Sequence, residues 1–167
     1  MEKAIKLFTA ASVLWFLAGS YANSAGLSEE RTKYSRAHQG VSARTAKLSV
    51  SRANARADAL LGFKYEHGLG VPQSFEVAAA LYERAAEQGD PTGQYLLGMM
   101  YDKGHGVWED TVLAHKWLNL AAAHASPRYR EQYLRIRDAV ASKMTPDQIY
   151  FAQQLAVKWV PSPVPPR

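Results

Sequence analysis

Residues 60–71 read LLGFKYEHGLGV, and residues 96–107 read LLGMMYDKGHGV. The two stretches align without a gap at an offset of 36 residues, and the Gly-x-Gly pair keeps its place in both. The register continues beyond them, because Ala78 matches Ala114 and Pro91 matches Pro127. Agreement of small residues at one fixed period indicates an array of structural repeats.

Each repeat is expected to form a helix, a tight turn and a second helix. Asn54 and Asp90 are good N-cap residues for the first helices, and the Gly-x-Gly pairs suit a left-handed end to them. Ser74 and Asp110 are N-cap residues for the second helices. Apolar residues recur at helical spacing between these boundaries, so each helix has one face to bury.

Small residues mark where the two helices of one repeat should meet. Gly62 and Gly98 occupy the same position in the first helices, and Ala78 and Ala114 do so in the second helices. We therefore expect the two backbones of each hairpin to approach closely at these positions.

The C-terminal third of the chain predicts a degenerate unit. Pro127 opens one helix, and Thr145 to Gln148 form a capping box that opens another. No Gly-x-Gly joins them, as suits a terminal capping unit. The prediction is an all-α, right-handed α-solenoid of full repeats at 54–89 and 90–125, a capping helical pair at 126–160 and a proline-rich tail at 161–167.

These residues resemble the Sel-one-like repeats, relatives of the tetratricopeptide repeats, over residues 54–160. The resemblance rests on the alanine, glycine and tyrosine positions of both copies, such as Gly62, Tyr65 and Gly68. It implies an α-solenoid that binds protein partners in envelope assembly, secretion, signalling or host interaction. One branch of the family is stapled by cysteine pairs and associated with penicillin binding. This chain contains no cysteine, so that activity is not carried over.

Residues 1–22 have the pattern of a secretory signal peptide. Lys3 and Lys6 precede an apolar run from Leu7 to Gly19. Ser20-Tyr21-Ala22 offers small residues at a cleavage site, and Ala22-Asn23-Ser24 is a second option. The run is shorter than the roughly 20 residues of a membrane-spanning helix. We expect a periplasmic or secreted protein, with an uncleaved membrane anchor as the alternative.

Positive charge is concentrated in an arm at residues 23–53 that we expect to be mostly disordered. Between Arg31 and Arg56 the chain carries basic residues and neither Asp nor Glu, whereas residues 57–167 hold 11 basic and 12 acidic residues. A solvated linker is the first interpretation. The alternative is contact with an anionic polymer or a membrane surface. Its candidate contacts are Arg31, Lys33, Arg36, Arg44 and Lys47.

The sequence offers no pattern for catalysis, a cofactor or a metal. The Gly-x-Gly pairs follow helices and lack the third glycine of a dinucleotide fingerprint. The five histidines form no metal-binding motif and are interpreted as surface residues. Glu83 and Glu87 lie one turn apart, which fits a solvated helix face better than an acid–base pair. We therefore expect no enzyme, no cofactor and no nucleic-acid partner, and we rank a cell-wall hydrolase last.

The remaining surface points to protein binding. In stacked helical hairpins the first helices line the concave side, where extended partners usually bind. The candidate contacts are Phe63, Lys64, Met99, Met100 and Lys103. Phe63 and Met99 could equally be core residues between repeats, and the sequence leaves that choice open. The predicted function is a noncatalytic scaffold that binds an envelope protein or peptide.

Overall fold

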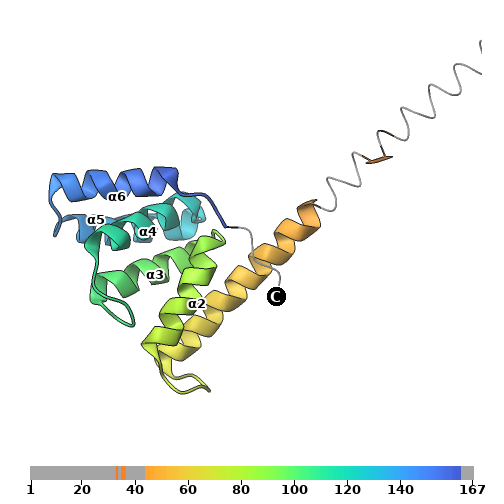
Figure 1. Ribbon diagram of the computed structural model, residues 1–167, viewed down its shortest axis with the longest axis horizontal. Coiled ribbons are helices and arrows are strands. Elements are labelled where there is room, and N and C mark those ends of the chain that lie inside the picture. The colour runs from red at the N-terminus through yellow and green to blue at the C-terminus, as the bar shows by residue number, and fades with distance from the viewer. Residues whose placement is uncertain (1–32, 34, 37–43, 163–167) are drawn as a thin grey trace, which may run out of the picture. The chain divides into compact units, whose positions relative to one another are not determined.

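The computed structural model describes residues 33, 35–36 and 44–162, and these residues contain helices and no strand. Residues 44–67 form the first helix, which Figure 1 draws without a label. It is followed by α2 (Phe75–Glu87), α3 (Pro91–Lys103), α4 (Thr111–His124), α5 (Pro127–Ala141) and α6 (Pro146–Lys158). The predicted all-α architecture is confirmed.

The chain divides into two units, residues 1–47 and 48–167. In the first unit the described residues are helical and exposed. The second unit holds the repeats. The predicted signal peptide, Arg31 and residues 163–167 of the tail lie outside the described residues.

Within the two full repeats, three of the four predicted helix starts are confirmed. The Ser74 hydroxyl accepts a hydrogen bond from the backbone N–H of Val77 at 3.2 Å. The Asp90 carboxylate accepts one from Gly93 at 2.7 Å, and Asp110 accepts one from Leu113 at 2.9 Å.

The fourth predicted start, at Asn54, is wrong. Asn54 lies inside the first helix, which is already formed at residue 44, so residues 44–53 of the expected disordered arm are helical. Arg, Ala, Lys and Leu in this segment favour the helix, and extending an existing helix avoids the cost of a new nucleus.

Close helix contact inside each hairpin is confirmed at the two predicted glycines. A Cβ added at Gly62 would lie 2.7 Å from the ring of Tyr82, and one added at Gly98 would lie 2.8 Å from Leu118. A larger side chain at either position would force these neighbouring atoms to move.

Both Gly-x-Gly turns adopt the left-handed backbone. Gly104 and Gly106 have φ angles of 66° and 70°, which glycine adopts without a Cβ clash. A Cβ at Gly106 would also lie 2.2 Å from the carbonyl oxygen of Phe75. The second turn therefore rests directly on the start of α2, which gives this glycine a purely structural role.

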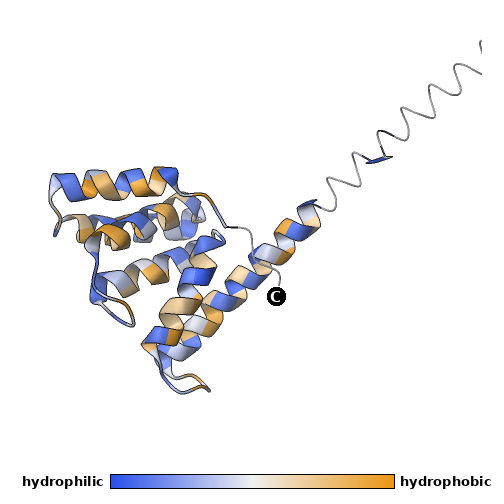
Figure 2. Cartoon of the chain, viewed as in Figure 1, coloured by the Kyte–Doolittle hydropathy of each residue, from blue (hydrophilic) through white to orange (hydrophobic). Residues whose placement is uncertain are grey.

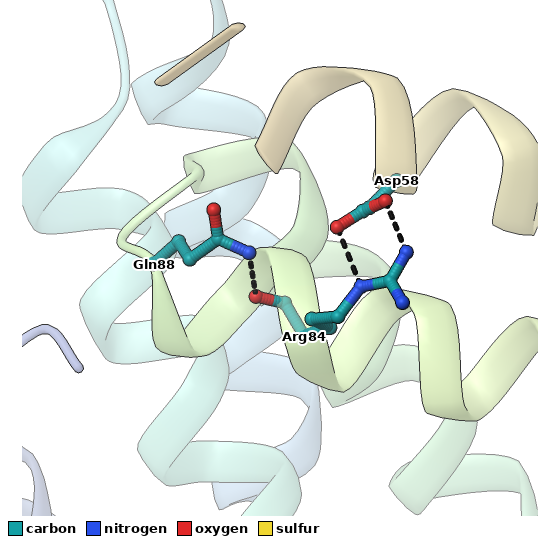
Figure 3. A network of polar contacts seen from close by, with 3 residues as sticks. All are labelled: Asp58, Arg84 and Gln88. Carbon is teal, nitrogen blue, oxygen red and sulfur yellow. Dashed lines mark hydrogen bonds and ion pairs between the residues drawn. The ribbon is translucent and has the colours of Figure 1, made fainter. Parts of the chain in front are cut away.

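An ion pair joins the first helix to α2. Arg84 donates from Nε to the Asp58 carboxylate at 2.7 Å, and a second, shorter bond runs from its terminal nitrogen to the other carboxylate oxygen. Figure 3 shows both bonds, together with the Gln88 side-chain amide, which donates to the carbonyl oxygen of Arg84. Asp58 is buried while Arg84 is half exposed. The pair fixes the register of the two helices.

The core is built around α4, which packs against α3, α5 and α6. The helices alternate between hydrophobic and hydrophilic residues, as Figure 2 shows. The largest cluster of buried residues draws on α2, α3, α4 and α6 and comprises Ala78, Ala79, Tyr82, Ala86, Leu97, Met100, Trp117, Leu120 and Ala156. The expected capping pair thus consists of two helices that both pack on α4.

The end of α6 reaches back to the first repeat. The Thr145–Gln148 capping box is present at its start, as predicted. At its end, Trp159 makes an edge-to-face contact with Trp117 at 6.1 Å between ring centres. Beyond it, the N–H of Ser162 donates to the carbonyl oxygen of Glu87 in α2. The third unit is therefore fastened to both full repeats.

Candidate protein-binding surface

The structure separates the predicted contact residues into two environments. Phe63 and Lys103 are exposed, and Met99 is half-buried. Met100 is only 2% exposed and belongs to the main core cluster. We expected Met100 on the exposed face, and that prediction is wrong. Met100 lies on the side of α3 that packs against α2. The sequence pattern alone did not distinguish this side from the side that carries Met99.

Lys64 is exposed for a different reason. It is the counterpart of Met100 at the 36-residue offset, but the described residues contain no helix of a preceding repeat to cover it. Neighbouring residues lie about 100° apart around a helix. Lys64 therefore does not share a face with Phe63, although both side chains are exposed.

Five residues that are at least partly accessible lie on the first helices of the three units: Phe63, His67, Met99, Lys103 and Arg135. We call this set the first-helix strip. Phe63, Met99 and Arg135 occupy the same position in three successive units. Lys103 lies one turn beyond Met99, and His67 one turn beyond Phe63. The sequence analysis did not place Arg135 and His67 with the protein-binding residues. The offset of 36 residues, carried on from Pro127, would have found Arg135.

The strip is already ordered at its first-repeat end. The His67 ring stacks on Phe63 with 4.1 Å between ring centres. Its Nδ1 lies 3.0 Å from the carbonyl oxygen of Phe63. The stacked pair offers a rigid aromatic surface, which lowers the entropy lost when a partner binds.

A tyrosine stack lies beside the strip on α3 and α5. Tyr95 stacks on Tyr133 with 4.4 Å between ring centres, and Tyr129 stacks on Tyr133 with 6.2 Å between ring centres. The Arg128 guanidinium lies 5.5 Å from the ring centre of Tyr129. Burial raises the pKa of Tyr133. Tyrosine and arginine are enriched at interface hot spots, and sequence reasoning did not single out this group.

The acidic and histidine side chains are the ones that could serve as metal ligands or as acid–base groups. Among the described residues, no group of three His, Asp or Glu side chains is placed to hold a metal ion. Glu83 and Glu87 are exposed on α2. His115, expected at the surface, is instead buried in α4. Its Nδ1 has no hydrogen-bond partner among the described residues, and burial lowers its pKa.

The basic arm residues that the structure describes are Lys33, Arg36, Arg44 and Lys47, and all four are exposed. Arg31, the fifth predicted contact, lies outside the described residues. In the described part of the chain, no helix combines the length and hydropathy needed to span a bilayer.

Comparison with known proteins identifies the repeats. The Sel1 repeat family matches residues 55–90 and 91–126. An uncharacterised protein of Neisseria meningitidis is 30% identical over 111 residues, which cover 66% of this chain and 23% of that protein. A component of an ERAD-associated E3 ubiquitin-protein ligase of Arabidopsis thaliana is 43% identical over 51 residues, or 30% of this chain and 8% of that protein.

A solved structure shares the arrangement of the helices. A protective antigen of uropathogenic Escherichia coli with an SLR fold superposes with a TM-score of 0.58 and 30% identity, covering 63% of this chain and 22% of the antigen. The chain thus spans about a quarter or less of the length of these relatives. Sel1 repeats generally serve as protein–protein interaction scaffolds. The chain is therefore a protein with two Sel1 repeats, built as an α-solenoid.

Proposed function

We propose that this protein is a noncatalytic scaffold that binds an extended segment of another protein along the first-helix strip. The observation that carries the proposal is the recurrence of Phe63, Met99 and Arg135 at one repeat position, with each side chain at least partly accessible. By contrast, the position two residues earlier is buried at Leu97 and Tyr133 in the second and third units and is open only at Leu61 in the first.

The chemistry of the strip indicates the chemistry of its partner. Phe63 and Met99 offer an aromatic and a flexible apolar surface, and methionine adapts readily to different side chains. Lys103 and Arg135 add positive charge at the other end. A partner segment that combines apolar and acidic side chains would satisfy both halves.

Export is the second part of the proposal. Residues 1–22 carry the charged start, apolar run and small-residue site of a signal peptide. The scaffold would then act in the periplasm or outside the cell, on an envelope protein. Mass spectrometry of the protein recovered from the envelope fraction should give a mature chain that begins after Ala22 or Ser24. A full-length chain would contradict cleavage.

In-cell photo-crosslinking tests where the partner binds. A photoreactive amino acid placed at Met99 should give a discrete adduct with one other protein. The same group at Tyr150, an exposed residue of α6, is the matched control and should give no such adduct. Equal adducts from both sites, or none from Met99, would contradict binding on the strip.

The exposed arm cations favour a second candidate function. Arg36, Arg44 and Lys47 place positive charge on the surface without nearby acidic residues in the sequence. Such an arm would bind an anionic polymer or lipid surface. Because screening weakens this attraction, high salt should release the protein from isolated envelopes if the arm dominates. Retention in high salt would favour the strip.

A further inference from the structure

The first helix exposes a largely apolar face, and two of its positions, Leu61 and Lys64, have counterparts that are buried or half-buried in both later units. We call this face the end stripe: Val50, Ala57, Leu61 and Lys64 form its middle, and Leu60 lies at its edge, one turn before Lys64. Leu60 is 60% exposed and Leu61 is 40% exposed. Hydrophobic residues are visible along this helix in Figure 2.

The second repeat shows what the same positions do when a neighbour is present. Gly93 is the counterpart of Ala57, and a Cβ added there would lie 2.6 Å from that of Ala85 in α2. Leu97 and Met100, the counterparts of Leu61 and Lys64, are buried in the cluster that contains α2. These positions of α3 therefore receive the second helix of the preceding repeat.

The third unit repeats this arrangement. Tyr133 corresponds to Leu97, and it packs against Ala121 and Ala122 of α4. Ile136 corresponds to Met100, and it packs against the cluster that contains Leu118. In both cases the covering helix presents several alanines, together with Tyr82 in α2 and Leu118 in α4. The end stripe is thus a stacking surface whose helix is missing from the described residues.

The charges on the first helix indicate which kind of helix fits. Its two acidic residues face inward, because Asp58 pairs with Arg84 and Glu66 accepts a hydrogen bond from the Tyr82 hydroxyl at 2.7 Å. The outward charges between residues 48 and 64 are therefore all basic: Arg52, Arg56 and Lys64.

We infer that the end stripe docks an α-helix of another protein, with a face of small residues flanked by acidic side chains. A second copy of this chain fits poorly, because self-pairing through the stripe would bring the same cations together. The inference rests on the proposed scaffold function and gives it a second, separate contact surface.

The probe for the test is a stapled peptide that copies α2, residues 74–88, labelled with a fluorophore. It has an alanine-rich face and carries Glu76, Glu83 and Glu87 against the single cation Arg84. Stapling is needed because an unconstrained helix of this length is marginal in water. A control peptide replaces the three glutamates by lysine. Binding to the full chain is followed by fluorescence anisotropy.

We expect saturable binding of the acidic peptide that weakens as salt is added. The exchange Leu60→Gln with Leu61→Gln should reduce the affinity about tenfold or more, since two leucine side chains lose their burial. The matched control, Tyr150→Gln with Val157→Gln on α6, should leave the affinity unchanged. Circular dichroism should show that both variants keep their helix content.

Two results would overturn the inference. One is that the wild-type chain binds the lysine peptide as tightly as the acidic peptide, or that the Leu60/Leu61 variant binds the acidic peptide as tightly as the wild-type chain does. The other is concentration-dependent self-association in sedimentation that the same variant abolishes, which would make the occupant a second copy. The variant Phe63→Asp with Met99→Asp separates the two proposals. It should lose the partner adduct of the first-helix strip but still bind the acidic peptide.

Discussion

At the scale of single residues, the adjacent methionines of α3 show how sharply environment changes along a helix. Met99 is half-buried on the first-helix strip, and Met100 is closed inside the core. Their side chains are identical, so only their angular position decides which can meet a partner. The sequence offered both as contacts because the direction of the covering helix α2 is a tertiary property.

Gly98 sets the distance between α3 and α4. The exchange Gly98→Val should lower the free energy of unfolding by roughly 1–3 kcal/mol, because a Cβ would lie 2.8 Å from Leu118 and 3.2 Å from the backbone of Ala114. Urea unfolding measures the change. Lys103→Val, on the exposed side of the same helix, controls for the β-branched side chain. A Gly98 variant as stable as this control would refute the close approach.

His115 should make stability depend on pH. Burial, aided by the positive charge of Arg137, lowers its pKa in the folded chain, while Asp138 opposes the shift. The unfolded chain takes up the proton first, at a pKa of about 6.5. Stability is therefore full above this pH and falls as the pH decreases through it.

The measurement compares unfolding free energies at pH 8 and pH 5. The wild-type protein should lose more unfolding free energy than the non-titrating variant His115→Gln over this interval. Equal losses in both proteins would show that the imidazole does not titrate differently in the folded state.

At the scale of elements, much of the hairpin pattern could be predicted because its determinants are local. Ser74, Asp90 and Asp110 cap their helices through their own side chains, and Gly104 adopts its left-handed backbone without help from distant residues. The failures have a tertiary cause. Asn54 has cap chemistry, but the helix before it continues, and His115 is buried by helices whose packing the sequence pattern did not reveal.

The Asp58–Arg84 pair should respond unequally to loss of either partner. Arg84→Gln leaves a buried carboxylate without its ion pair and should cost about 1–3 kcal/mol of unfolding free energy. Asp58→Asn leaves a half-exposed guanidinium that water can solvate, so its cost should be smaller. Thermal or urea unfolding of both variants gives the comparison. A larger loss for Asp58→Asn would contradict the assigned burial.

At the scale of the whole molecule, the third unit extends the packing of the two full repeats in the described part of the chain. Stacked repeats bury a continuous core only when enough units contact one another. Here α5 and α6 both pack on α4. Trp159 also reaches Gly89, which lies between the two repeats: a Cβ added at Gly89 would lie 3.7 Å from the Trp159 ring. The two ends of the array differ, since the first helix keeps its stacking face open.

Trp159→Ala should therefore destabilise the entire fold and not only its last helix. A half-buried tryptophan in contact with Trp117 should be worth about 2 kcal/mol. Trp108, which is 94% exposed in the second turn, is the matched control, and Trp108→Ala should change the free energy of unfolding by less than about 0.5 kcal/mol. Similar losses for both tryptophans would contradict the fastening role of Trp159.

The first-helix strip as a protein-binding surface is the central claim, and selection from a displayed random-peptide library tests it most directly. Peptides are selected on the wild-type chain and then measured on Phe63→Asp with Met99→Asp. We predict enrichment of peptides that combine apolar and acidic residues, with affinity for the variant at least tenfold weaker. Selected peptides that bind the variant as tightly as the wild type would place the binding surface elsewhere and contradict the account.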